Sequence, residues 1–338
     1  MKLFLTLILL ILCAFAKGGE ATITTYLEQV RVADPIEYKN IRLFPIITTK
    51  ILSAQTYITL DEATERGWLK IKETGSGQVN FVQLKNTSTK MIFVMTGEII
   101  SGAKQDRMLK EDILIPPKSS WIRVPVYCVE HGRWTQVSAE FTSERLLAPN
   151  ALRQRAKISE SQSEVWDEIA TSQERMGVMS TTGTVRANYA DKKVQKEVDE
   201  YVKRLEKVPR LSNLTIGVVA TTGNRIICFD MFANNDVLKK FWNKLIKSYT
   251  MDVLAGEKGI IDKKYVEDFI QALEHAHYTS TGTPGRGELV EIESDFGRGS
   301  ALTYRSAVIH MDFFPTDGII DEDSQLRLDF RRDQRLDD

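Results

Sequence analysis

The sequence predicts an α+β fold with a β-rich part, a helical connection and a second part that mixes helices with strands. Short runs of alternating apolar and polar residues lie close together within residues 22–140. Helix-forming residues dominate residues 141–208, and strand patterns return within residues 209–315. Because strands and helices come in separate runs, an α+β fold is favoured over an alternating α/β sheet.

The β-rich part begins with two half-buried strands at Ile41–Phe44 and Leu69–Lys72, where apolar and polar residues alternate. Between them, Asp61–Gly67 predicts a short capped helix that ends at a glycine. Further strands are expected at Val79–Leu84, Met91–Met95, Asp112–Ile115 and Ile122–Val126. From Ile23 to Val137 we therefore expect mainly short strands, which favour a sandwich or a barrel-like unit, including a jelly-roll-like form.

The rest of the chain is predicted to be helical before strands return. Ser143–Met176 is charged and helix-prone, and Asp191–Lys207 carries one apolar stripe at helical spacing. A hairpin then follows, with strands at Leu214–Ala220 and Arg225–Asp230. After it come two amphipathic helices, at Val237–Tyr249 and Tyr265–Leu273, and two strands, at Glu288–Glu293 and Leu302–Phe313. The glycine-rich segment 297–300 is expected to separate the two last strands.

The first sixteen residues predict a cleavable signal peptide. Lys2 precedes an apolar run from Leu3 to Leu12, and Ala14 and Ala16 suit the −3 and −1 positions of a cut after Ala16. A short membrane anchor is an alternative, but a helix of this length covers only about 21 Å and a bilayer core needs about 30 Å. A lipoprotein is the other alternative, although Leu12 stands where a small residue must precede Cys13. We therefore expect export to the periplasm or the outside of the cell.

Residues 17–315 are expected to form a single large domain, and residues 316–338 a charged tail. The chain has 42% hydrophobic and 27% charged residues and a formal net charge of −1. This near-neutral charge argues against a nucleic-acid or membrane-surface partner, which would need a clustered basic footprint. No second apolar run of membrane length follows the predicted signal peptide, so we expect no membrane contact after cleavage.

Two cysteines, Cys128 and Cys228, remain after cleavage of the signal peptide, and both lie in apolar runs. In an oxidising compartment they could pair if their Cα atoms lie within about 7 Å. We expect two buried free thiols, with a disulfide as the alternative.

One stretch is dense in residue types that carry chemistry. It supplies Glu98, Asp106 and Glu130 as candidate acids or bases. Its candidate ligand-binding residues are Gly97, Gly102, Lys104, Gln105, Arg107, Cys128, His131, Arg133 and Trp134. Lysine and arginine can hold an anion, and glycine lets the backbone approach a ligand closely. Alternatively, these charges pair with one another to fix the turns of a β-rich core, with Trp134 as a packing anchor.

The same stretch resembles a known domain family. The residues that carry the resemblance are Gly97-Glu98, Gly102-Ala103-Lys104-Gln105-Asp106-Arg107, Pro116-Pro117 and Cys128–Trp134. The stretch is similar to the domain family named for its association with ADP-ribosylglycohydrolases and rhodanese-phosphatases. The family pattern is Gly-Gly-Lys-Gln-Asp-Arg, so Ala103 replaces its second glycine, which puts the tightness of the backbone approach there in doubt. Gly223–Phe232 and the helix that ends in Ser248-Tyr249 also look like the family. The resemblance implies one unit over most of the chain and only an association with ADP-ribose or nucleotide metabolism.

Other motifs predict less. Gly97-Glu98 and Asp112–Pro116 are similar to the rhythm of cupin barrels, but no histidine lies between Gly97 and Val129, so no cupin metal site is expected. His275 and His277 are expected at a helix C-terminus, and His310 is expected in an apolar strand as a core or rim residue. The loop Thr281–Gly287 lacks the ending of a phosphate loop, but its Arg286 is a candidate to line a ligand cleft. No metal site is predicted, and no pattern indicates a cofactor.

Three functions remain open. The first is an exported binding or regulatory domain in which Lys104, Arg107 and Arg133 hold a small anionic ligand, such as a nucleotide or an ADP-ribose-like molecule, or a protein partner. The second is an extracytoplasmic hydrolase of a phosphorylated or glycosidic substrate, with Glu98 or Glu130 as general base. The third is a structural or interaction protein.

Overall fold

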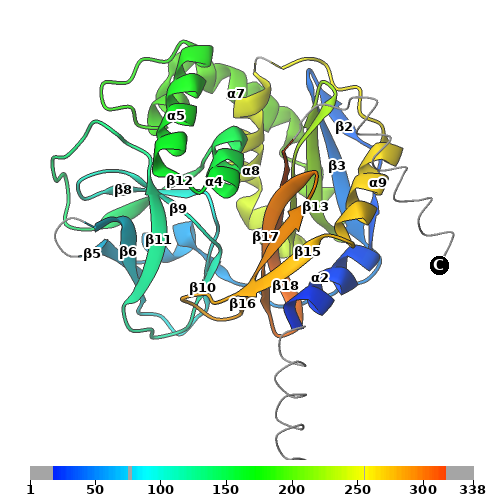
Figure 1. Cartoon of the computed structure of the whole chain (residues 1–338), viewed down its shortest axis with the longest axis horizontal. Coiled ribbons are helices and arrows are strands. Elements are labelled where there is room, and N and C mark those ends of the chain that lie inside the picture. The colour runs from blue at the N-terminus through cyan, green and yellow to red at the C-terminus, as the bar shows by residue number, and fades with distance from the viewer. Residues whose placement is uncertain (1–17, 75–77, 255, 317–338) are drawn as a thin grey trace, which may run out of the picture.

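The computed structural model describes residues 18–74, 78–254 and 256–316, so the predicted signal peptide and the charged tail beyond residue 316 lie outside the described residues. A β-rich half-barrel lies on one side and a large sheet on the other, with helices between and above them (Figure 1). Strands dominate the first part, helices the middle and strands the end. The predicted α+β class is therefore confirmed.

The half-barrel contains two sheets from the first half of the chain. The six-stranded sheet has the order β12-β8-β9-β11-β6-β5, with β12 at Phe141–Leu147, β8 at Glu98–Gly102, β9 at Arg107–Leu109, β11 at Ile122–Cys128, β6 at Gln78–Asn86 and β5 at Leu69–Thr74. The three-stranded sheet has the order β10-β7-β4, at Ile113–Ile115, Ile92–Val94 and Ile58–Thr59. Side chains from both sheets, among them Leu84, Ile113 and Val124, share one apolar core.

The large sheet joins strands from both ends of the chain. Its order is β1-β3-β13-β14-β18-β17-β16-β15, and β2 also pairs with β3. Its bounds are β1 Val30–Val32, β2 Ile36–Tyr38, β3 Ile41–Thr48, β13 Thr215–Thr222, β14 Arg225–Phe232, β15 His277–Thr281, β16 Glu288–Ser294, β17 Gly297–Tyr304 and β18 Ala307–Pro315. Within β13, Val218 and Val219 point to opposite faces, and both are fully buried. This sheet is therefore covered on both sides.

Helices cover the two faces of the large sheet. Helix α8 (Asn235–Val253) packs on the face toward the half-barrel, while α2 (Gly18–Glu28) and α9 (Lys263–Leu273) pack on the other (Figure 1). The remaining helices are α3 (Leu60–Glu65), α4 (Asn150–Ser159), α5 (Gln162–Met176), α6 (Arg186–Ala190), α7 (Lys192–Leu205) and the 3₁₀ helix η1 (Val208–Arg210). None of the described helices is both long and apolar enough to cross a membrane.

Local signals predicted several elements correctly. Helix α3 begins with a reciprocal capping box between Thr59 and Glu62, and Gly67 follows it with a φ of 64°. Helix α7 is capped by Asp191, and most of its predicted apolar stripe is buried, namely Val194, Val198, Tyr201 and Leu205. Cys128 and Cys228 are buried free thiols, so the disulfide alternative is wrong.

Other predictions were wrong because pairing partners distant in sequence decide the structure. The run from Ser143, predicted as helix, begins inside β12, which pairs with β8. The segment 297–300 lies inside β17, and the predicted strand Leu302–Phe313 is two strands joined at Arg305-Ser306. Residues 23–28, expected among strands, belong to α2. His277 begins β15 instead of ending a helix.

A buried chain of charges crosses from the half-barrel into the large sheet. His310 on β18 bonds Asp112 of the half-barrel through Nδ1 at 2.7 Å and Asp230 of β14 through Nε2 at 3.2 Å. Arg153 on α4 donates to Asp230 at 2.6 Å, and the Tyr249 hydroxyl on α8 donates to it at 2.7 Å. All of these side chains are buried. His310 therefore lies in the core, as predicted, with both ring nitrogens bonded.

We predict that His310→Gln destabilises the protein, and more strongly at acid pH than at alkaline pH. Burial alone would lower the pKa of His310, but Asp112 and Asp230 outweigh it and raise the pKa from 6.5 to about 9. A raised pKa stabilises the fold fully below pH 6.5, and this stabilisation is lost as the pH rises through 9. The variant should lose about 3 kcal/mol of unfolding free energy at pH 6.

Urea unfolding followed by tryptophan fluorescence at pH 6 and pH 9.5 measures this loss. The difference between the two proteins should shrink at the higher pH. His277→Gln is the control, because that side chain is exposed. An equal loss at both pH values would show that the charge on His310 contributes nothing.

Candidate functional site

The two parts of the sequence motif meet at one end of the half-barrel. Strand β8 ends at Gly102 and β9 begins at Arg107, while β11 ends at Cys128. Arg107 pairs with Cys128 in the β9–β11 ladder, and Val129 N donates to Asp106 O at 3.1 Å just beyond it. Gln105 Nε2 donates to Glu130 O at 2.9 Å. Both motif segments therefore form one structural unit.

Two carboxylates, Asp106 and Glu130, share one arginine in this unit. Arg133 Nη2 lies 3.1 Å from Asp106 Oδ1 and 2.6 Å from Glu130 Oε2. Arg133 Nε also donates to Glu130 Oε2 at 2.8 Å, and Asp106 N donates to the same oxygen at 3.1 Å. The two acids are thus held side by side, and each is nearly fully buried.

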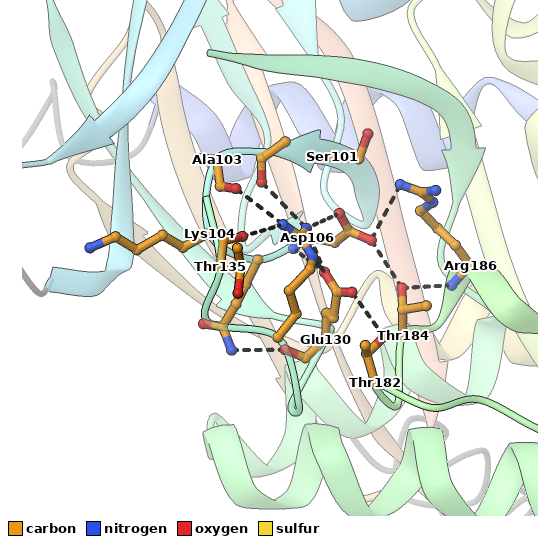
Figure 2. A network of polar contacts seen from close by, with 12 residues as sticks. Ser101, Ala103, Lys104, Asp106, Glu130, Thr135, Thr182, Thr184 and Arg186 are labelled. Atoms are coloured by element: carbon orange, nitrogen blue, oxygen red, sulfur yellow. Dashed lines mark hydrogen bonds and ion pairs between the residues drawn. The ribbon is translucent and has the colours of Figure 1, made fainter. Parts of the chain in front are cut away.

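A third segment, residues 182–186, completes the network (Figure 2). The Thr184 hydroxyl donates to Asp106 Oδ2 at 2.9 Å, and the Thr182 hydroxyl donates to Glu130 Oε1 at 2.9 Å. Arg186 Nη1 lies 3.5 Å from Asp106 Oδ2. We name these six residues, Asp106, Glu130, Arg133, Thr182, Thr184 and Arg186, the Asp106 network. Sequence reasoning missed the third segment; its only signal is the hydroxyl-rich run Ser180–Thr184 around Gly183.

All residues of the Asp106 network except Thr182 line part of an open hollow of about 630 Å³, which we call the site hollow. Lys70, Val137 and Phe141 line other parts of it. Pockets of roughly 300–1,000 Å³ are typical of small-molecule sites. The hollow is therefore large enough for a small ligand.

The environment moves the pKa values of the two acids in opposite directions. Burial raises the pKa of Asp106, and the neighbouring Glu130 raises it further. Burial acts on Glu130 in the same way, but hydrogen bonds from Arg133 and Thr182 outweigh it and bring its pKa below the usual value. The surroundings thus favour the protonated form of Asp106 and the ionised form of Glu130, each relative to its usual behaviour.

The family model for the ARG and rhodanese-phosphatase-superfamily-associated protein domain, ARPP-1, matches residues 29–314. The chain belongs to the ARPP-1 family. This match spans both motif segments, the half-barrel and the large sheet. Searches of the curated proteins and of the solved structures returned no match.

Several of the predicted residues of the ARPP-1 motif lie inside the protein rather than in the site hollow. Glu98 is fully buried, accepts a hydrogen bond from Met95 N at 2.7 Å and pairs with Lys244 of α8. Arg107 is buried and donates to Asp106 O at 3.2 Å. The Cys128 thiol donates to Glu130 O at 3.3 Å, and burial raises its pKa. These side chains shape the site without facing the hollow.

Other predicted residues lie outside the Asp106 network, and three of them, His131, Trp134 and Arg286, are exposed. The Lys104 side chain points away from the carboxylates (Figure 2). His131 packs against Trp166, with ring centroids 4.3 Å apart. Trp134 is 64% exposed, so it is not the packing anchor of the alternative interpretation. Arg286 is exposed and bonds Leu114 O through its backbone nitrogen at 2.7 Å, away from the residues that line the site hollow.

The two glycines of the motif have different structural reasons. Gly97 has a φ of 83°, and its Cα faces Arg153, where a Cβ would lie 3.0 Å from Cγ. Gly102 has a φ of 133°, and a Cβ there would lie 2.5 Å from Glu140 O. Ala103, which replaces the second glycine of the family pattern, adopts a left-handed φ of 42°. The close backbone approach is therefore made at Gly102, and the alanine is accommodated beside it.

Within residues 18–74, 78–254 and 256–316, no group of three or more His, Cys, Asp or Glu side chains is arranged to hold a metal ion. The carboxylates of the Asp106 network are instead surrounded by arginine and threonine donors. The charged side chains of the motif thus pair with one another, as the alternative interpretation of the motif predicted. The pairs that Arg133 makes with Asp106 and Glu130 also face the site hollow.

We predict that Gly102→Ala costs about 3 kcal/mol of unfolding free energy, because strain at this φ adds to a clash with Glu140 O. Gly67→Ala is the matched control, since Gly67 lines the same hollow, has a φ of 64° and has open space at its Cβ position. Its cost should be only about 1 kcal/mol. Equal losses for the two variants in urea unfolding would contradict the assigned role of Gly102.

Proposed function

We propose that the site hollow binds a small, hydroxyl-rich ligand through the Asp106 network. The observation that carries this proposal is the pair of buried carboxylates held side by side at the edge of the hollow. A carboxylate oxygen can accept two hydrogen bonds. Asp106 Oδ1 and Glu130 Oε1 each accept one from the protein, which leaves capacity for a ligand hydroxyl.

The state of the basic residues favours a hydroxyl group over a bare anion. Arg133 is bound by both carboxylates, and Arg107 is buried among its own neighbours. The Lys104 amine lies away from the network (Figure 2). Sugars, and the ribose of nucleotide-like molecules, supply hydroxyls that both donate and accept. The small anionic ligand expected from the sequence is therefore tested as the competing alternative in the binding experiment.

We further propose that the protein is exported, with support from the charged, apolar and small-residue pattern of residues 1–16. Protein recovered outside the cytoplasm should then begin at Lys17 by mass spectrometry. Recovery of only the full-length chain, starting at Met1, would contradict export by cleavage.

The binding proposal predicts a thermal shift with at least one sugar-containing probe. The panel contains glucose, N-acetylglucosamine, ribose, adenosine, ADP-ribose and inorganic phosphate. Asp106→Asn and Glu130→Gln should each weaken binding about tenfold to a hundredfold, because a hydrogen bond to a charged group contributes about 1.5–3 kcal/mol. Glu164→Gln, which removes an exposed ion pair between Glu164 of α5 and Arg155 of α4, should bind as the wild type does. The proposal would be contradicted if phosphate were the only probe that raised the melting temperature, or if none of the probes raised it.

A second candidate function is hydrolysis of a glycosidic or phosphorylated substrate at the same hollow. The specific observation in its favour is the opposite pKa shift of Asp106 and Glu130, because acid and base roles need two carboxyls that titrate apart. Asp106 would act as the protonated acid and Glu130 as the ionised base. Glu98, the other predicted base, is paired with Lys244 and does not line the hollow.

Hydrolysis predicts a bell-shaped dependence of kcat/KM on pH. Activity should rise as Glu130 loses its proton and fall at higher pH as Asp106 loses its own. Nitrophenyl phosphate and nitrophenyl glycosides, assayed from pH 3 to pH 8, measure this profile. Glu130→Gln should lower kcat about 10²–10⁴-fold, whereas Glu164→Gln should leave it unchanged. Turnover that survives in Glu130→Gln would eliminate this candidate.

A further inference from the structure

A second hollow of about 370 Å³ adjoins the site hollow. It lies between β12 and the helices α6, α7 and α8, and its lining includes Glu144, Tyr189, Gln195, Lys247 and Met251. Thr184 and Arg186 line both hollows. The two hollows are therefore neighbours across a single pair of side chains.

Arg186 marks the division between the two hollows. Its Nη1 lies 3.5 Å from Asp106 Oδ2 on the side of the site hollow and 3.3 Å from Glu144 Oε1 on the side of the second hollow. Its side chain is 39% exposed, so a ligand in either hollow can contact it. In Figure 2, Arg186 lies on the far side of Asp106 from Ala103 and Lys104. A ligand bound at Asp106 that extends along Arg186 enters the second hollow.

The second hollow mixes polar and apolar groups as the site hollow does. Leu146, Val198 and Met251 supply apolar surface, while Gln195 and Lys247 supply hydrogen-bonding groups. The Tyr189 hydroxyl donates to Leu147 O at 2.6 Å, which fixes the ring at the lining. Such a surface suits a ring that has apolar faces and hydroxyls at its edge.

The charge of the two hollows indicates which kind of two-part ligand fits. Together they are lined by five acidic and four basic side chains, so they carry no excess of positive charge. Arg186, at the division, is already paired with acids on both sides. The phosphates of a dinucleotide would meet no unpaired cation beside Arg186, so their loss of hydration there would not be compensated. A neutral linkage between two sugar rings has no charge that needs such compensation.

We infer that the natural ligand is an uncharged oligosaccharide of at least two units, with one ring in the site hollow, the next ring in the second hollow and the linkage beside Arg186. This inference rests on the proposed binding function and extends it by naming the ligand class and a second subsite. Ala190 is the residue that tests it, because it is exposed and lines the second hollow but not the site hollow.

The experiment compares one-unit and two-unit probes by isothermal titration calorimetry on the protein from Lys17 to Asp338. Glucose and N-acetylglucosamine are the one-unit probes; cellobiose, maltose and diacetylchitobiose are the two-unit probes. At least one disaccharide should bind tenfold or more tightly than its monosaccharide. Ala190→Trp, which fills the second hollow, should remove that gain and leave monosaccharide binding unchanged.

Ala21→Trp is the matched control, because Ala21 is an exposed alanine on α2. It should leave the affinities for both kinds of probe unchanged. Gln195→Ala is a milder second variant on α7 that should weaken disaccharide binding alone.

Monosaccharide binding with no gain for any disaccharide would overturn the second subsite and leave the proposed function standing. A disaccharide gain that survives Ala190→Trp would also overturn the subsite. ADP-ribose is titrated in the same experiment, and binding of ADP-ribose that is tighter than that of every disaccharide would overturn the uncharged ligand class. Absence of binding by every probe would contradict the proposed function itself.

Discussion

The architecture depends on Asp230, a fully buried carboxylate on a central strand of the large sheet. Arg153, His310 and Tyr249 reach it from α4, β18 and α8, and His310 continues the chain to Asp112 of the half-barrel. Taking so many charges out of water is costly, and it is compensated only when each charge keeps its partners. The half-barrel and the large sheet are therefore joined at one defined geometry rather than by apolar contact alone.

This geometry has consequences at the candidate site. Arg153 lies on α4, which follows β12 after two residues, and β12 is the edge strand whose residues line both hollows. A second buried tie, between Glu98 of β8 and Lys244 of α8, connects the strand paired with β12 to the helix that lines the second hollow. The core pairs and the surface hollows are thus parts of one framework, and loss of a core pair should disturb the site from a distance.

The site itself combines rigidity with open acceptor capacity. Backbone hydrogen bonds join its three segments, for example Gly132 N to Thr182 O at 2.8 Å and Val185 N to Val129 O at 3.0 Å. Side chains that are held in this way lose little freedom when a ligand binds, which favours affinity and orientation. Burial and the neighbouring Glu130 raise the pKa of Asp106, whereas hydrogen bonds from Arg133 and Thr182 bring the pKa of Glu130 below its usual value. One set of contacts therefore serves both structure and chemistry.

The sequence by itself determined the elements that form from local contacts, namely the capping box of α3, the apolar stripe of α7 and the β13–β14 hairpin, together with the family and the motif that carries it. Only the tertiary structure decided which partners those elements have. Strand β3 is remote in sequence from β13 yet pairs with it, and β12 forms within a helix-prone run because it pairs with β8. Thr182 and Thr184 reach the motif from the loop before α6, and Arg186 from the first residue of α6. Tertiary contacts also decided which carboxylates of the motif reach the site. Asp106 and Glu130 line the site hollow, whereas Glu98 pairs with Lys244, a residue far along the chain. Helix caps and hydrophobic periodicity depend on side chains within a few residues of one another, so the sequence shows them directly. Strand pairing and burial depend on residues that only folding brings together.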